Sequence, residues 1–253
     1  MKKYRYCDDK NYKNYTFQAL SSQFSDDQEF EAFYSSLKDS EIKDQFLRVG
    51  TLYFFFAKNG DWHVNDPNSN PVIEYFTNSF KLVAILAIIE SLSNKKHVDF
   101  FEWLSDSEKD ENELFPIKDK AELKKLYKEY KLDYGSIRRC KLFFANLSTE
   151  TRKKLCNLIS IDGEPVTIER VAEMIYMERS KFAHDCDSAL GISSGFHVAQ
   201  QKNKEIFWKQ FSMEILQNAF EEGVIIFFKK TASTGHPNPI DSNQNRFQLP
   251  SDK

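Results

Sequence analysis

Residues 168–184 read IERVAEMIYMERSKFAH, and this stretch predicts an amphipathic helix. Its apolar side chains recur at intervals of three and four residues, the spacing of one helix face: Ile168, Val171, Ala172, Ile175 and Phe182. Thr167 directly precedes the pattern and is a favoured N-cap residue. The helix is expected to end near the turn at 191–195.

One position breaks this pattern. After Ile175 the same face continues at Arg179, the only place where we expect a charged side chain to interrupt an apolar helix stripe. A charge in such a position is costly unless it meets a partner or a ligand. Departures from local rules of this kind concentrate at functional sites, so we treat Arg179 as a candidate functional residue.

Helical spacing extends outward from this segment in both directions. Val72–Leu92 is apolar on nearly every side between Leu82 and Ile89, which predicts a helix in the middle of the core. A long final helix is expected over about Asn203 to Lys229, although Gly223 weakens it by ~1 kcal/mol relative to alanine. Shorter helices are predicted at 98–104, 118–131, 136–147 and 149–159, and a turn at 162–165.

The region from Ser40 to Val64 supports two interpretations. Ile42, Phe46, Val49, Tyr53 and Phe56 follow helical spacing, and Asn59-Gly60 would end that helix. Asn-Gly is also a tight-turn signal, so a hairpin pairing 52–57 with 62–64 is the alternative. We favour the helix because isolated hairpins are weak in water.

Composition favours helices throughout. The 253 residues include only 8 glycines and 7 prolines, which argues against a turn-rich β-sandwich or barrel, and 41% are apolar, enough for a large core. The predicted fold class is all-α: an antiparallel helical bundle over residues 70–230, with an N-terminal helical extension at 1–69 and a flexible tail at 231–253.

Charge is nearly balanced overall but separated locally. The formal net charge is −3, which excludes a chain coated with basic residues. Asp99–Leu114 carries seven acidic residues and one lysine, whereas Lys118–Lys154 carries twelve basic and five acidic residues. The basic segment could contact RNA through Arg138, Arg139 and Lys141, or it could be a solvated helix face that pairs with the acidic segment.

The remaining features place the chain in the cytoplasm and away from membranes. Its four cysteines form no C-x-x-C pair, and no apolar run approaches the roughly 20 residues of a bilayer span. His184, Asp185, Cys186 and His197 are metal-ligand types at no recognised spacing, so we expect no metal and no cofactor.

Arg179-Ser180-Lys181-Phe182-Ala183-His184 resembles the signature of the HEPN superfamily, in which an arginine is followed after four to six residues by a histidine. The upstream stretch FKLVAILAIIESL (80–92) resembles the family's first helix, and together the two features cover about Pro71 to Lys230 in the manner of the Apea-like branch. This chain departs from close relatives in having Asp185, where they place glycine after the histidine.

The resemblance implies a metal-independent endoribonuclease that acts as a homodimer on RNA. Five residues along a helix separate Arg179 and His184 by ~140° and ~7.5 Å of rise, so a phosphate is reached more readily by groups from two copies around a two-fold axis. His184 would be the general base and Arg179 the stabiliser of phosphate charge. Ser180 and Glu90 would support them, and Lys181 would join Arg138, Arg139 and Lys141 in binding substrate.

A toxin or antiviral defence effector restrained by an antitoxin or regulator protein would fit this activity. The alternative from another class is a HEPN-like dimerisation or nucleotide-binding module that does not cleave RNA, in which Arg179 only closes an interface. A third interpretation is a purely structural helical interaction domain. The plainest interpretation of the motif itself is that Arg179 is an ion-pairing surface residue and His184 an ordinary helix-end histidine.

Overall fold

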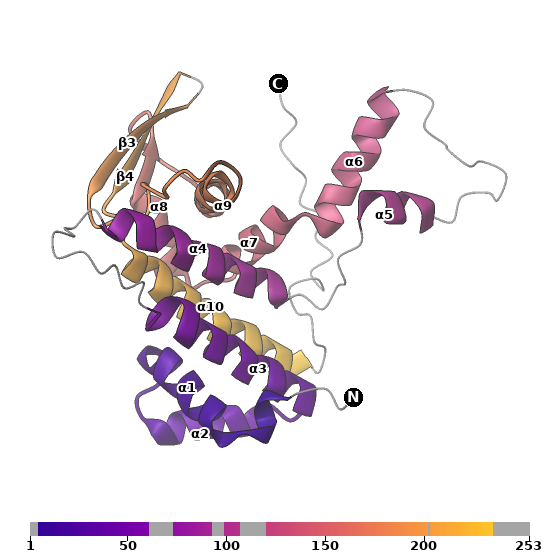
Figure 1. The fold of residues 1–253 in the computed structure, drawn as a ribbon, viewed down its shortest axis with the longest axis vertical. Helices are drawn as coiled ribbons and strands as arrows, with labels where there is room; N and C mark the ends of the chain where they lie inside the picture. The colour runs from indigo at the N-terminus through magenta and orange to yellow at the C-terminus, as the bar shows by residue number, and fades with distance from the viewer. Residues whose placement is uncertain (1–4, 61–72, 93–98, 107–119, 202, 235–253) are drawn as a thin grey trace.

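The fold was analysed on a computed structural model that describes all residues except 1–4, 61–72, 93–98, 107–119, 202 and 235–253. The described part of the chain is mostly helical, with a small antiparallel sheet (Figure 1). Its helices are α1 (Lys10–Leu20), α2 (Asp27–Ser36), α3 (Ser40–Tyr53), α4 (Ile73–Ser91), α5 (Phe100–Asp106), α6 (Lys120–Tyr134), α7 (Ser136–Ala145), α8 (Thr149–Asn157), α9 (Ile168–Asp185) and α10 (Met213–Thr234). Its strands are β1 (Ile159–Ile161), β2 (Glu164–Pro165), β3 (Phe196–Gln201) and β4 (Lys204–Lys209).

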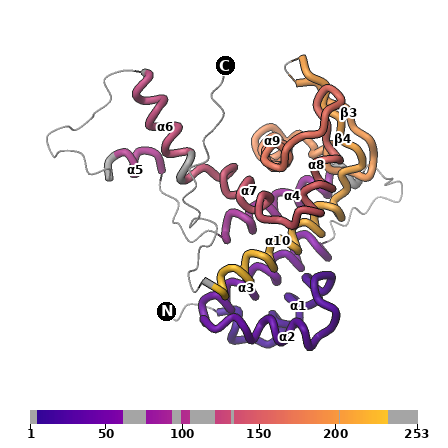
Figure 2. The backbone as a smooth tube through the Cα atoms, turned by 180° about the vertical axis from the view of Figure 1, so that it is seen from behind, coloured from indigo at the N-terminus to yellow at the C-terminus, as the bar shows by residue number. Residues whose placement is uncertain are grey.

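Three long helices form the middle of the molecule. Figure 1 shows α3, α10 and α4 as neighbours, with α1 and α2 on the far side of α3 and with α9 and the sheet beyond α4. The view from behind in Figure 2 shows the same order and places α5 and α6 to one side, away from the sheet. Helices α7 and α9, which carry most of the candidate site residues, therefore lie across the central helices from α1 and α2, and α4 is the central helix nearest to them.

The buried core runs continuously from the N-terminal helices to α10. The Phe46 and Phe228 rings lie 5.1 Å apart, and those of Tyr53 and Phe220 lie 4.6 Å apart. All four side chains belong to one cluster of buried apolar residues. The domain boundary at residue 70 stays a prediction, and the core crosses it.

The segment that begins at Ser40 is a helix and not a hairpin. The α3 helix is followed without a break by a π-helical turn over Phe54–Lys58. The Asp39 side chain caps its first turn by accepting from the backbone N–H of Glu41 at 2.6 Å. Residues 62–64 of the alternative hairpin lie outside the described residues.

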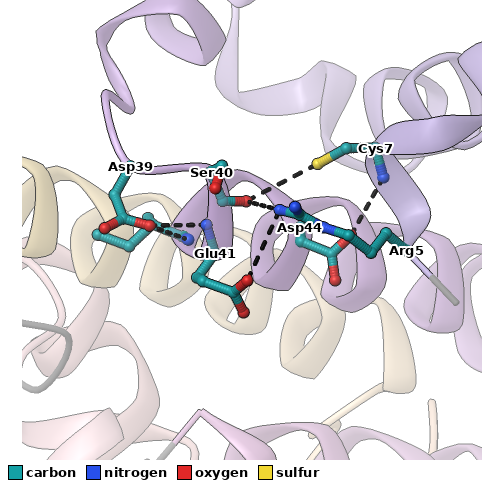
Figure 3. Close-up of polar contacts among 7 residues, drawn as sticks. Arg5, Cys7, Asp39, Ser40, Glu41 and Asp44 are labelled. Carbon is teal, nitrogen blue, oxygen red and sulfur yellow. Dashed lines mark hydrogen bonds and ion pairs between the residues drawn. The ribbon is translucent and has the colours of Figure 1, made fainter. Parts of the chain in front are cut away.

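The N-terminal segment is tied to the start of α3 by polar contacts (Figure 3). The Arg5 guanidinium donates to the Ser40 carbonyl at 2.9 Å and pairs with Glu41 and Asp44 at 3.8 and 4.0 Å. The Cys7 backbone N–H donates to Asp44 at 3.1 Å. Partial burial and the nearby Asp44 carboxylate raise the pKa of the Cys7 thiol, so this cysteine is a packed residue and not an activated nucleophile.

The expectation of an all-α fold is wrong in one region. A four-stranded antiparallel sheet of order β2-β1-β4-β3 joins the end of α8 to the hairpin before α10. Ile159 pairs with Trp208 and Ile161 with Ile206, and this apolar face packs inward. Ile206 and Trp208 share the buried face of β4 because side chains alternate along a strand. On a helix, residues two apart would lie about 200° apart.

The predicted final helix is therefore wrong over Asn203–Lys209, where Asn203 lies in the turn before β4 and the other residues form β4 itself. Asn203 has φ +64°, a left-handed conformation that asparagine tolerates in tight turns. The helix itself begins at Met213 and continues to Thr234, four residues into the segment expected as a tail. The end of α9 also differs from the prediction. This helix stops at Asp185 and not near 191–195, because Cys186 adopts φ +61° and closes the helix.

The prediction that α4 is buried on nearly every side is only partly confirmed. Leu82, Ile85, Leu86 and Ile89 are buried in the core, but Ala87 within the predicted stretch is exposed, and Phe80 just before it is 42% exposed. The helix thus has an inner face and an edge, and the Phe80 edge contacts Phe182 of α9 at 5.0 Å between ring centroids.

None of the helices in the described part of the chain combines the length and the apolarity needed to cross a bilayer.

Candidate functional site

The candidate site residues Arg179, Ser180, Lys181 and His184 all lie on α9, in its last two turns. The helix begins as expected, because the Thr167 side chain accepts a hydrogen bond from the backbone N–H of Arg170. His184 occupies the last turn, where the partial negative charge of a helix C-terminus favours a cationic group.

Arg179 is half-buried and incompletely satisfied. Its guanidinium carbon lies 5.6 Å from the centroid of the Tyr176 ring, one turn earlier on α9. Its Nε atom is buried and has no hydrogen-bond partner. Leaving a buried donor unsatisfied costs about 1–3 kcal/mol, more for a charged group, so this atom calls for an acceptor that the described chain does not supply.

His184 has the opposite environment. The side chain is exposed at the end of α9, close to the exposed Asp185 and Cys186. Arg179 and His184 are thus held on one continuous helix, one half-covered and one open to solvent. The structure does not bring the two side chains together within one copy of the chain.

The two residues between them differ in their contacts. Ser180 is half-buried. Lys181 is exposed and pairs with Glu178 at 3.1 Å, and Glu178 also accepts from the backbone N–H of Gly191 at 3.4 Å. Lys181 is therefore engaged locally, and Glu178 ties the segment after α9 back onto the helix.

Glu90 lies on α4, near Cys140 of α7. Burial is the main cause that raises the pKa of the Cys140 thiol, and the Glu90 carboxylate adds to it. The Cys140 sulfur contacts the carbonyl of Ala172 at 3.6 Å, seven residues or about 10 Å of helix before Arg179. No ion pair joins Glu90 to Arg179 among the described residues, and the Glu90 Oε1 atom is itself buried without a hydrogen-bond partner.

The predicted substrate-binding residues of α7 face the protein more than the solvent. Arg138, Arg139 and Lys141 are all half-buried. Lys141 forms an ion pair with Glu173 of α9, which also pairs with Arg170 at 2.8 Å. The Arg139 guanidinium donates to the backbone carbonyl of Glu90 at 3.2 Å. Lys141 and Arg139 thus hold α7 against α9 and α4.

The ion pairs between α7 and α9 lower the pKa of Glu173. Burial alone would raise the pKa of Glu173, but the hydrogen bonds and charges of Lys141 and Arg170 outweigh it and hold that pKa below its ordinary value of 4.5. Glu173 is therefore a carboxylate held ionised by two cations, which is a structural role.

A second charged residue, Glu221, lies on a buried helix face, and the sequence did not lead us to predict it. Glu221 of α10 is fully buried and accepts hydrogen bonds from the Tyr53 hydroxyl at 2.6 Å, from the Lys58 ammonium and from the Ser22 hydroxyl. Burial, followed by the Glu221 charge, raises the pKa of the Tyr53 hydroxyl and keeps it protonated as a donor. Arg179 is consequently not the only charge that interrupts an apolar stripe.

Glu221 could have been found from spacing. It lies three and seven residues before Val224 and Phe228, on the buried face of α10. The same test that singles out Arg179 therefore singles out Glu221 as well.

In the described parts of the chain, no three His, Cys, Asp or Glu side chains gather closely enough to hold a metal ion. His197 is half-buried in β3 opposite Trp208, away from the exposed end of α9 that carries His184.

Comparison with known proteins adds no relative: no protein-family model, no curated protein and no solved structure matches this chain.

Proposed function

We propose that this chain is a metal-independent endoribonuclease of the HEPN type, with Arg179 and His184 as its reacting groups. The observation that carries the proposal is the buried, unpartnered Nε of Arg179, five residues before an exposed histidine on the same helix. A phosphate oxygen is an acceptor that suits a guanidinium, since the planar fork can bind two such oxygens and keeps its charge.

In the proposed reaction, a ribose 2′-hydroxyl attacks the neighbouring phosphorus. His184 accepts the hydroxyl proton, the bond from phosphorus to the 5′-oxygen breaks, and that oxygen takes a proton from solvent or from a second His184. The products are a 2′,3′-cyclic phosphate and a 5′-hydroxyl end. Arg179 stabilises the negative charge that develops on the phosphate oxygens.

The two groups are proposed to act from different copies of the chain. On one helix they diverge by ~140°, and the structure keeps Arg179 half-covered while His184 is open. A two-fold axis near the end of α9 would set Arg179 of one copy beside His184 of the other. Ser180 lies next to this surface and is a candidate substrate contact.

Glu90 and the α7 cations receive a different role in the proposal. The contacts of Arg139 and Lys141 support the helices that carry the site, and Glu90 forms no ion pair with Arg179 in the described part of the chain. We assign them to positioning α7, α4 and α9.

The test is cleavage of a single-stranded RNA in the presence of EDTA. Wild-type chain is expected to cut, and His184→Ala and Arg179→Met are expected to lose at least about 100-fold in rate, the contribution of a general base or of a charge-stabilising donor.

Arg152→Met is the matched control. Arg152 on α8 also has a buried Nε without a hydrogen-bond partner, but its guanidinium donates to Thr149 at 3.3 Å and it lies outside the motif. This variant should cut at the wild-type rate. Absence of cleavage by the wild-type chain, or equal cleavage by His184→Ala, would refute the enzyme. RNA binding without cleavage would favour the non-catalytic module.

A further inference from the structure

The two edges of the sheet are built differently. The edge strand β2 has only two residues, and one of them is Pro165, which has no N–H to offer. The other edge strand, β3, has six residues with the sequence FHVAQQ, which contains no proline and no charged side chain. Only the β2 edge therefore carries the features that protect a sheet from pairing with another strand.

The hydrogen-bond pattern shows which residues of β3 present their backbone to the open edge. The Gln210 N–H donates to the Gly195 carbonyl at 3.2 Å, so this pair exchanges bonds across the hairpin. Hydrogen-bonded and non-hydrogen-bonded pairs alternate along an antiparallel ladder. The N–H and C=O groups of Phe196, Val198 and Gln200 consequently point away from β4. Consistently, the Lys209 N–H, opposite Phe196, donates to Leu158 on the β1 side.

The same residues are apolar and exposed. Phe196 is 61% exposed and Val198 is 48% exposed, on the face of the sheet opposite the buried Ile206 and Trp208. Val198 pairs with Phe207, and the rings of Phe196 and Phe207 lie 6.0 Å apart. Unpaired backbone groups and exposed apolar side chains thus coincide along one edge.

We propose that the β3 edge pairs antiparallel with the β3 edge of a second copy of this chain, which joins the two sheets into one. A two-fold axis must set edge-facing residues opposite edge-facing residues. The pairing that centres on Val198 satisfies this condition along 196–200, with Val198 opposite Val198 and Phe196 opposite Gln200.

A second copy fits this edge because the pairing is self-complementary. Directly opposite residues share a face, so Phe207 and Val198 of one copy continue into Val198 and Phe207 of the other as a single apolar row. Because β3 carries no charge, no like charges meet within the paired strands. This interface does not rest on the proposed ribonuclease activity, whose two-fold contact at the end of α9 is proposed to form around bound RNA, so the mass of the RNA-free chain reports on the β3 edge alone.

The test is the mass of the full chain in solution over the micromolar range, measured by sedimentation equilibrium. Wild-type chain should have twice the chain mass of 29.7 kDa. Val198→Lys and Val198→Glu should each fall to the single-chain mass, because each sets two like charges directly opposite one another at the axis. An equal mixture of the two variants should recover the doubled mass.

Gln200→Lys is the control. The added lysine would face Phe196 of the other copy and not a second lysine, so the doubled mass should persist. A wild-type chain of single mass throughout, a Val198→Lys chain that keeps the doubled mass, or a mixture that fails to associate would each overturn the Val198-centred pairing. Circular dichroism confirms that each variant is folded.

Discussion

Two buried charges of this molecule have opposite surroundings. Glu221, between α3 and α10, is fully buried and accepts bonds from a tyrosine, a lysine and a serine. Arg179, on α9, has a buried Nε with no hydrogen-bond partner. A buried charge whose contacts are complete holds a fold together, whereas one with a missing contact is available to a ligand. An unpartnered atom alone does not mark a functional charge, because Arg152 has a buried, unpartnered Nε as well. Arg179 is distinguished by its place on the core-facing stripe of α9, five residues before an exposed histidine.

The largest expected effect comes from removing Glu221, the buried charge whose contacts are complete. Glu221→Ala removes the acceptor shared by Tyr53, Lys58 and Ser22 and leaves the buried Tyr53 hydroxyl without its partner. We expect the free energy of unfolding to fall by about 3 kcal/mol, as when one partner of a buried charged network is removed. Urea unfolding followed by circular dichroism measures this change.

Glu214→Ala is the control for that variant, since Glu214 is exposed in the first turn of the same helix. Its loss should stay below about 1 kcal/mol. Equal losses in the two variants would mean that the network around Glu221 contributes nothing beyond an ordinary surface charge.

The next effect probes how tightly the region around Glu221 is packed. A Cβ atom on Gly223 would lie 2.3 Å from Cζ of the buried Phe143 ring. Gly223→Ala should therefore destabilise the protein by about 1–2 kcal/mol, even though alanine is the better helix former. Asn218→Ala, at an exposed site on α10, should be neutral or slightly stabilising. A stabilised Gly223→Ala chain would show that Phe143 can move aside.

A smaller effect comes from the network that lies beside the candidate site. Because the folded chain holds the pKa of Glu173 below 4.5, this carboxylate stabilises the fold above pH 4.5, and the contribution is lost as pH falls through the lower folded pKa. Glu173→Gln should reduce the acid dependence of the urea midpoint and change it by at most about 1 kcal/mol, since the group is partly exposed. Identical pH profiles for the two chains would contradict this assignment.

Helical periodicity accounted for most of the fold. The segments that became α3, α4, α7 and α9 have apolar residues at three- and four-residue spacing, and local spacing decides a helix. The sheet could not be found in this way. Strand β1 has three residues and pairs with β4 across more than forty residues of chain, so its stability comes from a nonlocal contact.

The candidate site shows the same division. The position of Arg179 on the core-facing stripe of α9 could be read from spacing, and the half-buried side chain agrees with it. The separation of Glu90 from Arg179 and the pairing of Lys141 with Glu173 depend on how α4, α7 and α9 pack. Charge counts along the sequence do not contain that information.

The measurement that tests the central claim most directly is the free energy of unfolding of Arg179→Met relative to wild type. Methionine keeps much of the apolar contact with Tyr176 and removes the unsatisfied Nε, so the account predicts a value equal to wild type or up to about 1 kcal/mol higher. A loss of about 2 kcal/mol or more would contradict it, because Arg179 would then be a structural charge like Glu221.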